Sequence, residues 1–556
     1  MTRHMHAAEP LSHFVDDYLG YLYEACPTHA TLDGIHLHDD LLEDFRPGTI
    51  DTHLGALAGF ARRLDAIPVA LLPLQEQVDH AIAIGNIRAR MFELEETRTW
   101  ERSPHLYGEV LASSLATQAI FTYAPEEERA RRVLSKLRQV PRLIQAARDN
   151  IKDPPAIYVK VGLDTWRGVK SFIDADLPRA FSTVDDLHLL ADLADACAEA
   201  VQAAGAYVEY LETDLRPRSK GTFRLGAERF EQKLRLEEGL QLPVERLLTI
   251  AMRELKETQE EFRRVAGRLN GGDPLEAWHK TKDVHPAPGT LIATARAQVN
   301  ELRTFLSRTP IVGLPEGDDV TVGATPEFFR WSFASMWTPG PFETRASRAM
   351  YFLTDADPSW PAQRQVEHLR DFNTPTLWTI SMHEVFPGHY LHYQHLRRVT
   401  SKVRRSTLFA PASYIEGWAH YCEQMMLEAG FGRGDAALKL GQLGEALVRL
   451  ARFVVGIRLH TDDWSVEQGV RFFREEAFLE EASARREAER GTFDPTYLVY
   501  SAGKLMLLKL RRDWQEEQRG KTTLRAFHDA FLAQGSAPFP ALRRLMLDNV
   551  AGDVLE

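Results

Sequence analysis

The segment LADLADACAEAVQAAGAYVEYLETDL, residues 190–215, places apolar side chains three and four positions apart along its whole length. The segment VERLLTIAMRELKETQEEFRRVAGRL, residues 244–269, has the same spacing. Because an α-helix completes a turn in about 3.6 residues, this spacing gathers the apolar side chains on one packing face. Most of the chain follows the pattern, which predicts a mainly α-helical protein, a large helical body with a central groove.

One region, residues 320–354, departs from the helical pattern. Its segments VTVG and RAMYFLT are short and rich in β-branched or aromatic residues, and the Pro- and Gly-rich stretch WTPGPFE lies between them. These features predict a small antiparallel β-sheet just before the strongest motif of the chain. Such a sheet is either a structural hairpin or an edge that pairs with the backbone of an extended ligand.

The composition is that of an ordinary globular protein, with 44% apolar and 26% charged residues. The net charge of −12 argues against a basic face that could neutralise a run of phosphates, so we expect no nucleic-acid partner. The one concentrated basic stretch, residues 397–405, is bounded by apolar segments, and we interpret it as the solvated end of a helix. Since no segment has about twenty consecutive apolar residues, we expect no membrane partner.

The three cysteines, Cys26, Cys197 and Cys422, have neither CxxC spacing nor the density of a disulfide-rich secreted domain. The N-terminal sequence MTRHMHAAEPLSHFVDDYLGYLY lacks the basic segment followed by an apolar run that marks a secretory signal. Both features predict a cytoplasmic protein.

The strongest motif lies in DFNTPTLWTISMHEVFPGHYLHYQHLRRV, residues 371–399. The dipeptide Thr-Pro supplies an N-cap followed by proline at the first helical position, so a helix should begin at Thr374. On this helix, HEVFPGH resembles the HExxH sequence of zinc hydrolases, in which two histidines bind the metal and the glutamate acts as a base. We therefore predict His383 and His389 as metal ligands and Glu384 as the base.

The two histidines are six residues apart instead of four. Six residues of a regular helix separate two side chains by about 120°, so an undistorted helix would not let both histidines reach one metal ion. Pro387 removes a backbone donor, and Gly388 tolerates unusual backbone angles. We predict a local bulge at these two residues that brings His389 back beside His383.

A third ligand should come from another helix, because a catalytic zinc ion usually takes three protein ligands and leaves one position for water. The segment SYIEGWAHYCEQMMLEAG, residues 413–430, is an amphipathic helix with Glu416, His420 and Glu423 on one face. We predict Glu416 as the third ligand of one zinc ion, or another divalent ion, per chain. Glu423 would accept a hydrogen bond from the free nitrogen of a ligand histidine and fix its tautomer.

Two further histidines need an interpretation. His420 either helps to hold the substrate or the reaction oxyanion, or pairs with other groups across a helix interface. His392 follows His383 on the same segment, but no adjacent glutamate is placed there to act as a base. We therefore expect His392 to lie outside the metal site.

Residues 490–513, RGTFDPTYLVYSAGKLMLLKLRRD, place Tyr497 and Tyr500 just before a Ser-Ala-Gly turn and an apolar helix. A tyrosine hydroxyl can donate a hydrogen bond to the oxyanion that develops on a carbonyl oxygen. Packing is the alternative role of these aromatic side chains.

These motifs resemble the bacterial family called domain of unknown function 885, which has a recurring HExxPGH pattern and an EGWA helix. The resemblance extends to TFRLGAERFEQKL at 222–234, EGWAHYCE at 416–423 and ERGTFDPTYLVYSAGKLMLLKLR at 489–511. That family resembles in turn the family-32 zinc carboxypeptidases, mainly helical enzymes with a long groove that often form homodimers. In those enzymes a second glutamate follows the ligand glutamate by seven residues, as Glu423 follows Glu416.

The resemblance implies that Tyr500 stabilises the oxyanion, with Arg490 and Lys504 near it as substrate-binding groups. Arg345 and Arg348 lie beside a predicted strand. They are further candidates, because a guanidinium group can bind a substrate carboxylate through two hydrogen bonds.

Together the motifs predict a zinc-dependent hydrolase, a carboxypeptidase-like metallopeptidase that cleaves peptides with a water molecule that Glu384 deprotonates. The alternatives are a hydrolase of a small non-peptide amide and a catalytically silent helical binding protein with a structural metal. The intact Glu384 argues against a silent protein, since a structural metal site needs no base.

We predict that the 556 residues form a single helical catalytic unit. An N-terminal half, 1–215, and a catalytic half, 216–556, are its possible subdivisions. The expected long connections are the clusters of proline and glycine around residues 152–163, 270–289 and 309–326.

Overall fold

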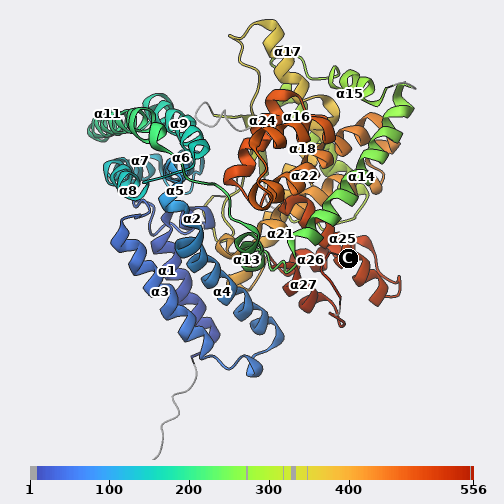
Figure 1. Cartoon of the computed structure of the whole chain (residues 1–556), viewed down its shortest axis with the longest axis horizontal. Coiled ribbons are helices and arrows are strands. Elements are labelled where there is room, and N and C mark those ends of the chain that lie inside the picture. Colours follow the sequence, from blue (N-terminus) through green and yellow to red (C-terminus); the bar gives the residue numbers. More distant parts are fainter. Residues whose placement is uncertain are drawn as a thin grey trace, which may run out of the picture. The chain divides into compact units, whose positions relative to one another are not determined.

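The computed structural model describes residues 9–270, 273–316, 319–326, 333–346, 348–550 and 552–555. These residues are mainly α-helical, which confirms the predicted fold class (Figure 1). The chain divides into two compact units. Unit 1 comprises Met1–Phe223, Pro339–Ser347 and Thr400–Phe409, and unit 2 comprises Arg224–Thr338, Arg348–Val399 and Ala410–Glu556.

Unit 1 is helical in its described residues. Its elements are α1 (Leu11–Ala25), α2 (Pro27–Asp33), α3 (Pro47–Asp65), η1 (Val69–Leu71), α4 (Leu74–Phe92), η2 (Glu93–Thr97), α5 (Thr99–Arg102), α6 (Pro104–Ile120), α7 (Glu126–Leu137), α8 (Val140–Asn150), α9 (Ala156–Ser171), η3 (Phe172–Asp176), α10 (Leu177–Ala180), α11 (Leu187–Tyr210), η4 (Leu211–Leu215), α12 (Arg216–Arg218), α20 (Lys402–Arg405) and η6 (Thr407–Phe409). The predicted helix over 190–215 is α11 together with η4. Asp186 caps α11, because its carboxylate accepts the backbone N–H groups of His188 and Leu189.

Two late segments of the sequence complete unit 1 around Asp33. This carboxylate is buried, and it accepts hydrogen bonds from the Tyr23 hydroxyl, the Ser406 hydroxyl and the Thr407 backbone. Residues 400–405 of the basic stretch that we interpreted as a solvated helix end belong to unit 1, and that interpretation is wrong for Arg404. Arg404 is only 5% exposed, because its guanidinium group pairs with Asp79 at 2.7 Å.

A second polar cluster in unit 1 joins His36 to two carboxylates. Its Nδ1 lies 2.9 Å from Asp39 Oδ2 and its Nε2 lies 2.7 Å from Glu343 Oε2. The imidazole also stacks on the Tyr123 ring at 3.6 Å. Burial disfavours the charged imidazole, but the two carboxylates outweigh it and raise the pKa of His36. Because a neutral imidazole has one N–H and an imidazolium has two, the arrangement favours the charged form.

Unit 2 holds the remaining helices and the only sheet of the described residues. Its elements are α13 (Ala227–Glu237), α14 (Val244–Asn270), α15 (Pro274–Lys282), α16 (Leu291–Arg308), β1 (Asp319–Ala324), β2 (Ala334–Trp337), β3 (Arg348–Leu353), α17 (Ala362–Asp371), α18 (Thr374–Glu384), α19 (His389–Leu396), α21 (Ala412–Glu428), η7 (Phe431–Gly434), α22 (Ala436–Thr461), α23 (Val466–Glu476), α24 (Glu481–Phe493), α25 (Val499–Glu517), α26 (Leu524–Ala533) and α27 (Phe539–Met546). The predicted helix over 244–269 is α14. The core of unit 2 forms where α14 packs on α22 and where α21 packs on α25.

The sheet lies beside α18 but is mixed, so the predicted antiparallel pairing is wrong. β3 is the central strand, with β1 parallel and β2 antiparallel to it. The reason is that β1 and β3 are not joined by a hairpin: β2 intervenes, and the following segment Pro339–Ser347 belongs to unit 1. From β3, the Tyr351 hydroxyl lies 3.3 Å from that of Ser381, two residues before His383.

Two of the expected long connections contain helices. α9 begins at Ala156 directly after Pro155, and α15 begins with Pro274 behind the capping carboxylate of Asp273. Proline is favoured at the start of a helix, so these prolines mark helix starts within the predicted loops. The boundary predicted at residue 215 lies near the end of the first segment of unit 1, Phe223.

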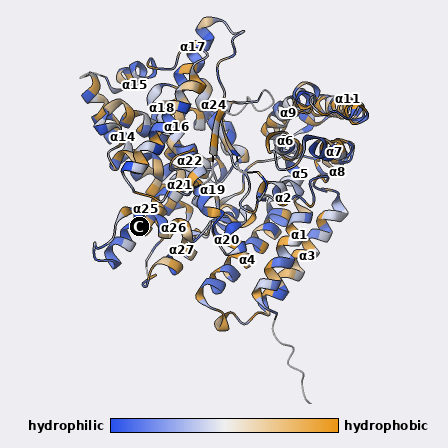
Figure 2. Cartoon of the chain, turned by 180° about the vertical axis from the view of Figure 1, so that it is seen from behind, coloured by the Kyte–Doolittle hydropathy of each residue, from blue (hydrophilic) through white to orange (hydrophobic). Residues whose placement is uncertain are grey.

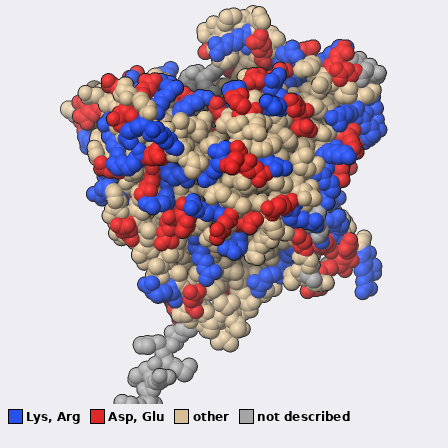
Figure 3. All heavy atoms as spheres, in the orientation of Figure 1, with Lys and Arg blue, Asp and Glu red and all other residues tan. Residues whose placement is uncertain are grey.

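The helices carry both apolar and polar residues along their length (Figure 2). On the face shown in Figure 3, lysine and arginine are interspersed with aspartate and glutamate. No helix within the described ranges combines the length and the apolar character that crossing a membrane requires.

Candidate metal centre

The first two site residues lie at the end of α18. The helix begins at Thr374 as predicted, but the cap is Asn373, whose side chain accepts the backbone N–H of Thr376 at 3.1 Å. Its last two residues are His383 and Glu384. The HEVFPGH motif therefore starts on one helix.

The predicted bulge inside a continuous helix is wrong, because the helix breaks and α19 starts afresh at His389. The Phe386–Pro387 peptide bond between the two helices is cis. Gly388 follows with its N–H bonded to the Met382 carbonyl at 3.0 Å. A Cβ atom on Gly388 would lie 1.7 Å from the His383 carbonyl oxygen, so only glycine fits there.

Helix α21 holds the broken segment. The indole N–H of fully buried Trp418 donates a hydrogen bond to the Pro387 carbonyl at 3.0 Å. The Cys422 thiol donates to the same oxygen at 3.6 Å. The Pro387 carbonyl at the break therefore accepts hydrogen bonds from α21. The same helix carries Glu416.

Three ligand atoms converge between α18, α19 and α21. Glu416 Oε2 lies 3.3 Å from His383 Nε2 and 3.6 Å from His389 Nε2. The two imidazole rings are 4.7 Å apart and nearly perpendicular. His383, His389 and Glu416 form the only group of three or more possible ligands with mutual distances within 4.8 Å in the described part of the chain. The structure therefore brings together the three predicted ligands.

The chemistry of this group fits a divalent metal such as zinc. Glu416 Oε2 is buried, and among the described residues it makes no hydrogen bond but lies beside the Nε2 atoms of His383 and His389. Two imidazole nitrogens and one carboxylate oxygen are a donor set that catalytic zinc takes, with one position left for water. Glu416 and Glu423 outweigh burial and raise the pKa of His383 to about 9, so metal binding must displace a proton from it.

Glu423 connects the ligands to a buried layer behind them. Its carboxylate is fully buried, accepts the His383 Nδ1–H at 2.8 Å and accepts the His420 Nδ1–H at 3.0 Å. These bonds place both protons on Nδ1 and leave Nε2 of His383 free for a metal. Burial lowers the pKa of His420 to about 3, so this histidine is neutral. His420 therefore lies in the second layer, paired with Glu423.

Arg449 on α22 completes this layer and was missed by the sequence analysis. It forms an ion pair with Glu423 at 3.1 Å and donates a hydrogen bond to Glu445 at 2.8 Å. Burial disfavours the ionised Glu423, but Arg449 and the two histidines outweigh it and lower the pKa of that carboxyl. The only sequence signal was an arginine at a position that falls on the buried face of α22.

Glu384 has an environment unlike that of Glu423. It is half-buried and makes no hydrogen bond or ion pair with the described residues. Since it directly follows the ligand His383, its carboxylate is free to accept a proton from a group held at the site.

Tyr500 belongs to the site, whereas Tyr497 packs in the core. The Tyr500 ring lies 6.4 Å from that of His383, and Arg490 donates to its hydroxyl at 3.4 Å. Burial and the Glu416 carboxylate raise the pKa of Tyr500, which keeps the hydroxyl protonated. Tyr497 is 1% exposed, and its hydroxyl bonds the Glu487 carbonyl.

The other predicted substrate-binding residues are only partly near the site. Lys504 lies one turn after Tyr500 on α25, makes no ion pair with the described residues, and has a pKa lowered to about 8 by burial. Arg348 is exposed at the start of β3, and Arg345 lies in unit 1. The Arg348 side chain makes no hydrogen bond or ion pair in the described part of the chain, and the substrate-binding role of both arginines stays a prediction.

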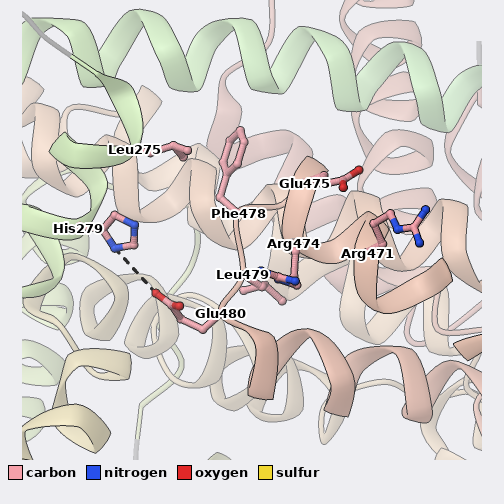
Figure 4. Close-up of a pocket in the computed structure, with 8 residues that line it drawn as sticks. All are labelled: Leu275, His279, Arg471, Arg474, Glu475, Phe478, Leu479 and Glu480. Carbon is pink, nitrogen blue, oxygen red and sulfur yellow. Dashed lines mark ion pairs between the residues drawn. The ribbon is translucent and has the colours of Figure 1, made fainter. Parts of the chain in front are cut away.

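His392 lies outside the ligand group, as predicted. It is buried, with its Nε2 3.2 Å from the Ser536 hydroxyl. A separate pocket of about 270 Å³ lies between α15, α23 and residues 478–480, which follow α23 (Figure 4). None of its lining residues is a candidate site residue, and its His279 and Glu480 face each other at 3.8 Å.

The fold is shared with two solved structures. One is of a "putative lipoprotein of unknown function" from Shewanella oneidensis, with a TM-score of 0.80 and 24% identity over 97% of this chain and 100% of that chain. The other is of a "putative lipoprotein" from Colwellia psychrerythraea, with a TM-score of 0.81 and 18% identity over 97% of this chain and 99% of that chain. The comparison with curated proteins gave no match.

The predicted cytoplasmic location is wrong by these comparisons, because both similar structures are described as lipoproteins. The prediction depended partly on the cysteines. Cys197 and Cys422 are buried, and a buried thiol is protected from oxidation in any compartment, so a low cysteine count carries little information on location.

Residues 27–546 match the family described as "Bacterial protein of unknown function (DUF885)". The match covers nearly all of both units, including the HEVFPGH and EGWA segments that form the ligand group. The chain therefore belongs to the DUF885 family.

Proposed function

We propose that this protein is a zinc-dependent hydrolase, a metallopeptidase that acts on peptides. The convergence of His383, His389 and Glu416 beside the unpaired Glu384 carries the proposal. A structural metal site would not need a free carboxylate next to its ligands, so the arrangement favours catalysis over a silent binding protein.

The side chains divide the work of hydrolysis. A zinc ion held by His383, His389 and Glu416 would act as a Lewis acid and lower the pKa of a water molecule. Glu384 accepts a proton from that water and passes it to the leaving amine. Tyr500 donates a hydrogen bond to the oxyanion that develops on the carbonyl oxygen.

The buried side chains behind the ligand group hold His383 in position. Glu423 holds the His383 proton on Nδ1, and Arg449 keeps Glu423 ionised. Outer hydrogen bonds of this kind typically contribute 10- to 100-fold to metal affinity or activity. His420 shares the same carboxylate and supports it through a neutral N–H donor.

The proposed partners are a peptide or small amide substrate and one zinc ion per chain. The resemblance to family-32 zinc carboxypeptidases suggests a related metallopeptidase and a homodimer, and leaves exo- or endo-cleavage open. A non-peptide amide is the alternative substrate, since the HEVFPGH motif specifies how water is activated and says little about what is cleaved.

Metal analysis combined with a peptide screen tests the proposal. We expect one zinc ion per chain in freshly purified protein, and its loss in His383→Ala, His389→Ala and Glu416→Ala. Cys197→Ser, in unit 1, is the control and should keep the metal. Short peptides, free or blocked at either terminus, should be hydrolysed only by the loaded protein. Cleavage of small amides without any peptide would favour the alternative substrate, and a metal retained in all three ligand variants would contradict the site.

A further inference from the structure

Tyr500 is surrounded by three arginine side chains. The guanidinium carbons of Arg449, Arg452 and Arg490 lie 5.8, 5.0 and 5.8 Å from the centre of its ring. Cations at this distance interact favourably with the electron-rich face of an aromatic ring. Arg452 and Arg490 have no role in the proposed hydrolytic mechanism.

Each of these cations is held in place by a carboxylate of its own. Arg449 pairs with Glu423, Arg452 with Glu487, and Arg490 with Asp494. Arg452 meets Glu487 through two contacts, at 2.6 and 2.8 Å, which is the planar two-point geometry of a guanidinium–carboxylate pair. The cluster around Tyr500 is therefore a built arrangement of fixed charges.

The hydrogen bond from Arg490 determines which way the Tyr500 hydroxyl can donate. Arg490 Nη2 donates to the phenolic oxygen at 3.4 Å. A guanidinium group has five N–H donors and no acceptor, so the Tyr500 hydrogen cannot be given back to Arg490. No acceptor for this hydrogen is present among the described residues around Tyr500. The Tyr500 hydrogen is left for a group that binds beside this ring, which lies 6.4 Å from the His383 ring.

We infer that Arg490 is a positioning residue that turns the Tyr500 hydroxyl into a donor aimed at the ligand group. This inference rests on the proposed function. It replaces the predicted contact between Arg490 and a substrate carboxylate, because Asp494 already takes the Nε and Nη2 donors at 3.0 and 2.9 Å. A substrate carboxylate would therefore have to bind through Nη1 alone or displace the Tyr500 hydroxyl from Nη2.

Binding of inorganic phosphate to the zinc-loaded protein tests the inference without any activity assay. Phosphate is a tetrahedral oxyanion, and titration calorimetry measures its affinity. A hydrogen bond to a charged group is lost in Tyr500→Phe, so affinity should fall at least about tenfold. In the otherwise native protein, Arg490→Met should lower the affinity for phosphate by about three- to tenfold. In the Tyr500→Phe protein, Arg490→Met should cause no further loss of affinity.

Arg486→Met is the matched control, because it removes the same charge from an exposed position on the same helix. It should leave phosphate affinity unchanged. Equal losses from Arg490→Met in both backgrounds would overturn the inference alone, since Arg490 would then act directly on the anion. Failure of the native protein to take up zinc would overturn the proposed function, and this inference with it.

On a peptide that the protein hydrolyses, the two roles of Arg490 differ again. A positioning role predicts that Arg490→Met lowers kcat with KM unchanged, equally for peptides with a free or an amidated C-terminus. A rise in KM confined to peptides with a free carboxylate would make Arg490 a substrate-binding residue and contradict the inference.

Discussion

Two glutamates of the candidate site have opposite surroundings, which fit the different roles that we propose for them. Glu423 is fully buried, accepts hydrogen bonds from two histidines and forms an ion pair with Arg449, so its charge is held in place. Glu384 is half-buried and has no partner among the described residues. Carboxylates held in different environments commonly divide into a fixed electrostatic group and a working acid or base.

The role of Glu384 predicts the behaviour of Glu384→Gln. The amide keeps the size of the side chain but cannot accept the proton, so turnover should fall at least about a hundredfold. Metal content and folding should stay native, because Glu384 is outside the ligand group. Elemental analysis and single-turnover kinetics check both parts. Loss of the metal together with turnover would instead make Glu384 a ligand.

The sequence predicted the three ligands and Glu423, but it missed Arg449 and the role of Trp418. The ligands follow from residue type and spacing within short segments. Arg449 and Trp418 act through partners on other helices, and nothing in their local sequence says which helix will face them. The substrate-binding role of Arg345 and Arg348 stays a prediction, since closeness along the chain to a strand does not tell where a side chain lies relative to the site.

The break between α18 and α19 depends on the close approach of Gly388 to α18. Gly388→Ala would place a methyl group 1.7 Å from the His383 carbonyl, so α18 and α19 must move apart and the two histidines with them. We expect metal affinity to fall by at least about tenfold. Gly267→Ala in α14 is the control, because its Cβ would meet nothing within 4 Å. Equal zinc affinity in both variants, measured by competition with a chelator, would show that the close approach does not set the ligand geometry.

The hydrogen bond from Trp418 on α21 to the Pro387 carbonyl predicts that Trp418→Phe lowers stability and zinc affinity. The variant keeps an aromatic ring but removes the donor to the Pro387 carbonyl, which destabilises the segment by about 1–3 kcal/mol. Zinc affinity should fall, since this segment positions His389. Trp514→Phe is a matched control, because that indole bonds the Thr522 hydroxyl instead. Chelator competition on the two variants checks the prediction, and unchanged affinity in Trp418→Phe would refute it.

Among the elements, the long helices were predictable and the sheet was only partly so. Residues 190–215 and 244–269 have a periodic apolar face, which specifies a helix locally. The strand segments VTVG and RAMYFLT were also found, but their direction depends on where the chain goes between them. The sequence does not show that Pro339–Ser347 joins unit 1 or that β2 pairs with β3. The break at Pro387 and Gly388 was located correctly, yet its form needed the packing of α21.

For the whole chain, metal binding should stabilise unit 2 selectively, because all three ligands lie within it. A ligand at about a thousandfold excess over its dissociation constant adds about 4 kcal/mol to the free energy of unfolding. Hydrogen exchange with and without zinc should show new protection in α18, α19 and α21. Glu416→Gln should abolish this protection. Equal protection of α11 in unit 1 would contradict a site confined to unit 2.

The His36 cluster predicts a pH dependence for unit 1. The pKa of His36 is raised in the folded protein. The contribution of His36 to the free energy of unfolding is therefore fully present below its unfolded pKa of about 6.5, and it is lost as the pH rises through the folded pKa. The pKa of Asp39 is lowered in the folded protein, so the stability that Asp39 contributes is lost only as the pH falls far below about 4. Hydrogen exchange of α2 should therefore quicken, after correction for the intrinsic rate, as pH rises from about 6 to 9. His36→Gln should flatten this trend, and an unchanged slope would exclude His36 as its source.

The hydrogen bonds of Asp33 also bear on how the protein is made. Its partners Ser406 and Thr407 leave the ribosome roughly 20 to 75 s after it, at a synthesis rate of about 5–20 residues per second. Throughout that interval the nascent N-terminal helices carry a carboxylate that the finished protein buries. Unit 1 is therefore translated first but can be completed only after the metal-binding motif on α18 has been synthesised. Maturation of the two units is coupled by the order of synthesis, and a nascent chain that stalls before residue 400 would leave both unfinished.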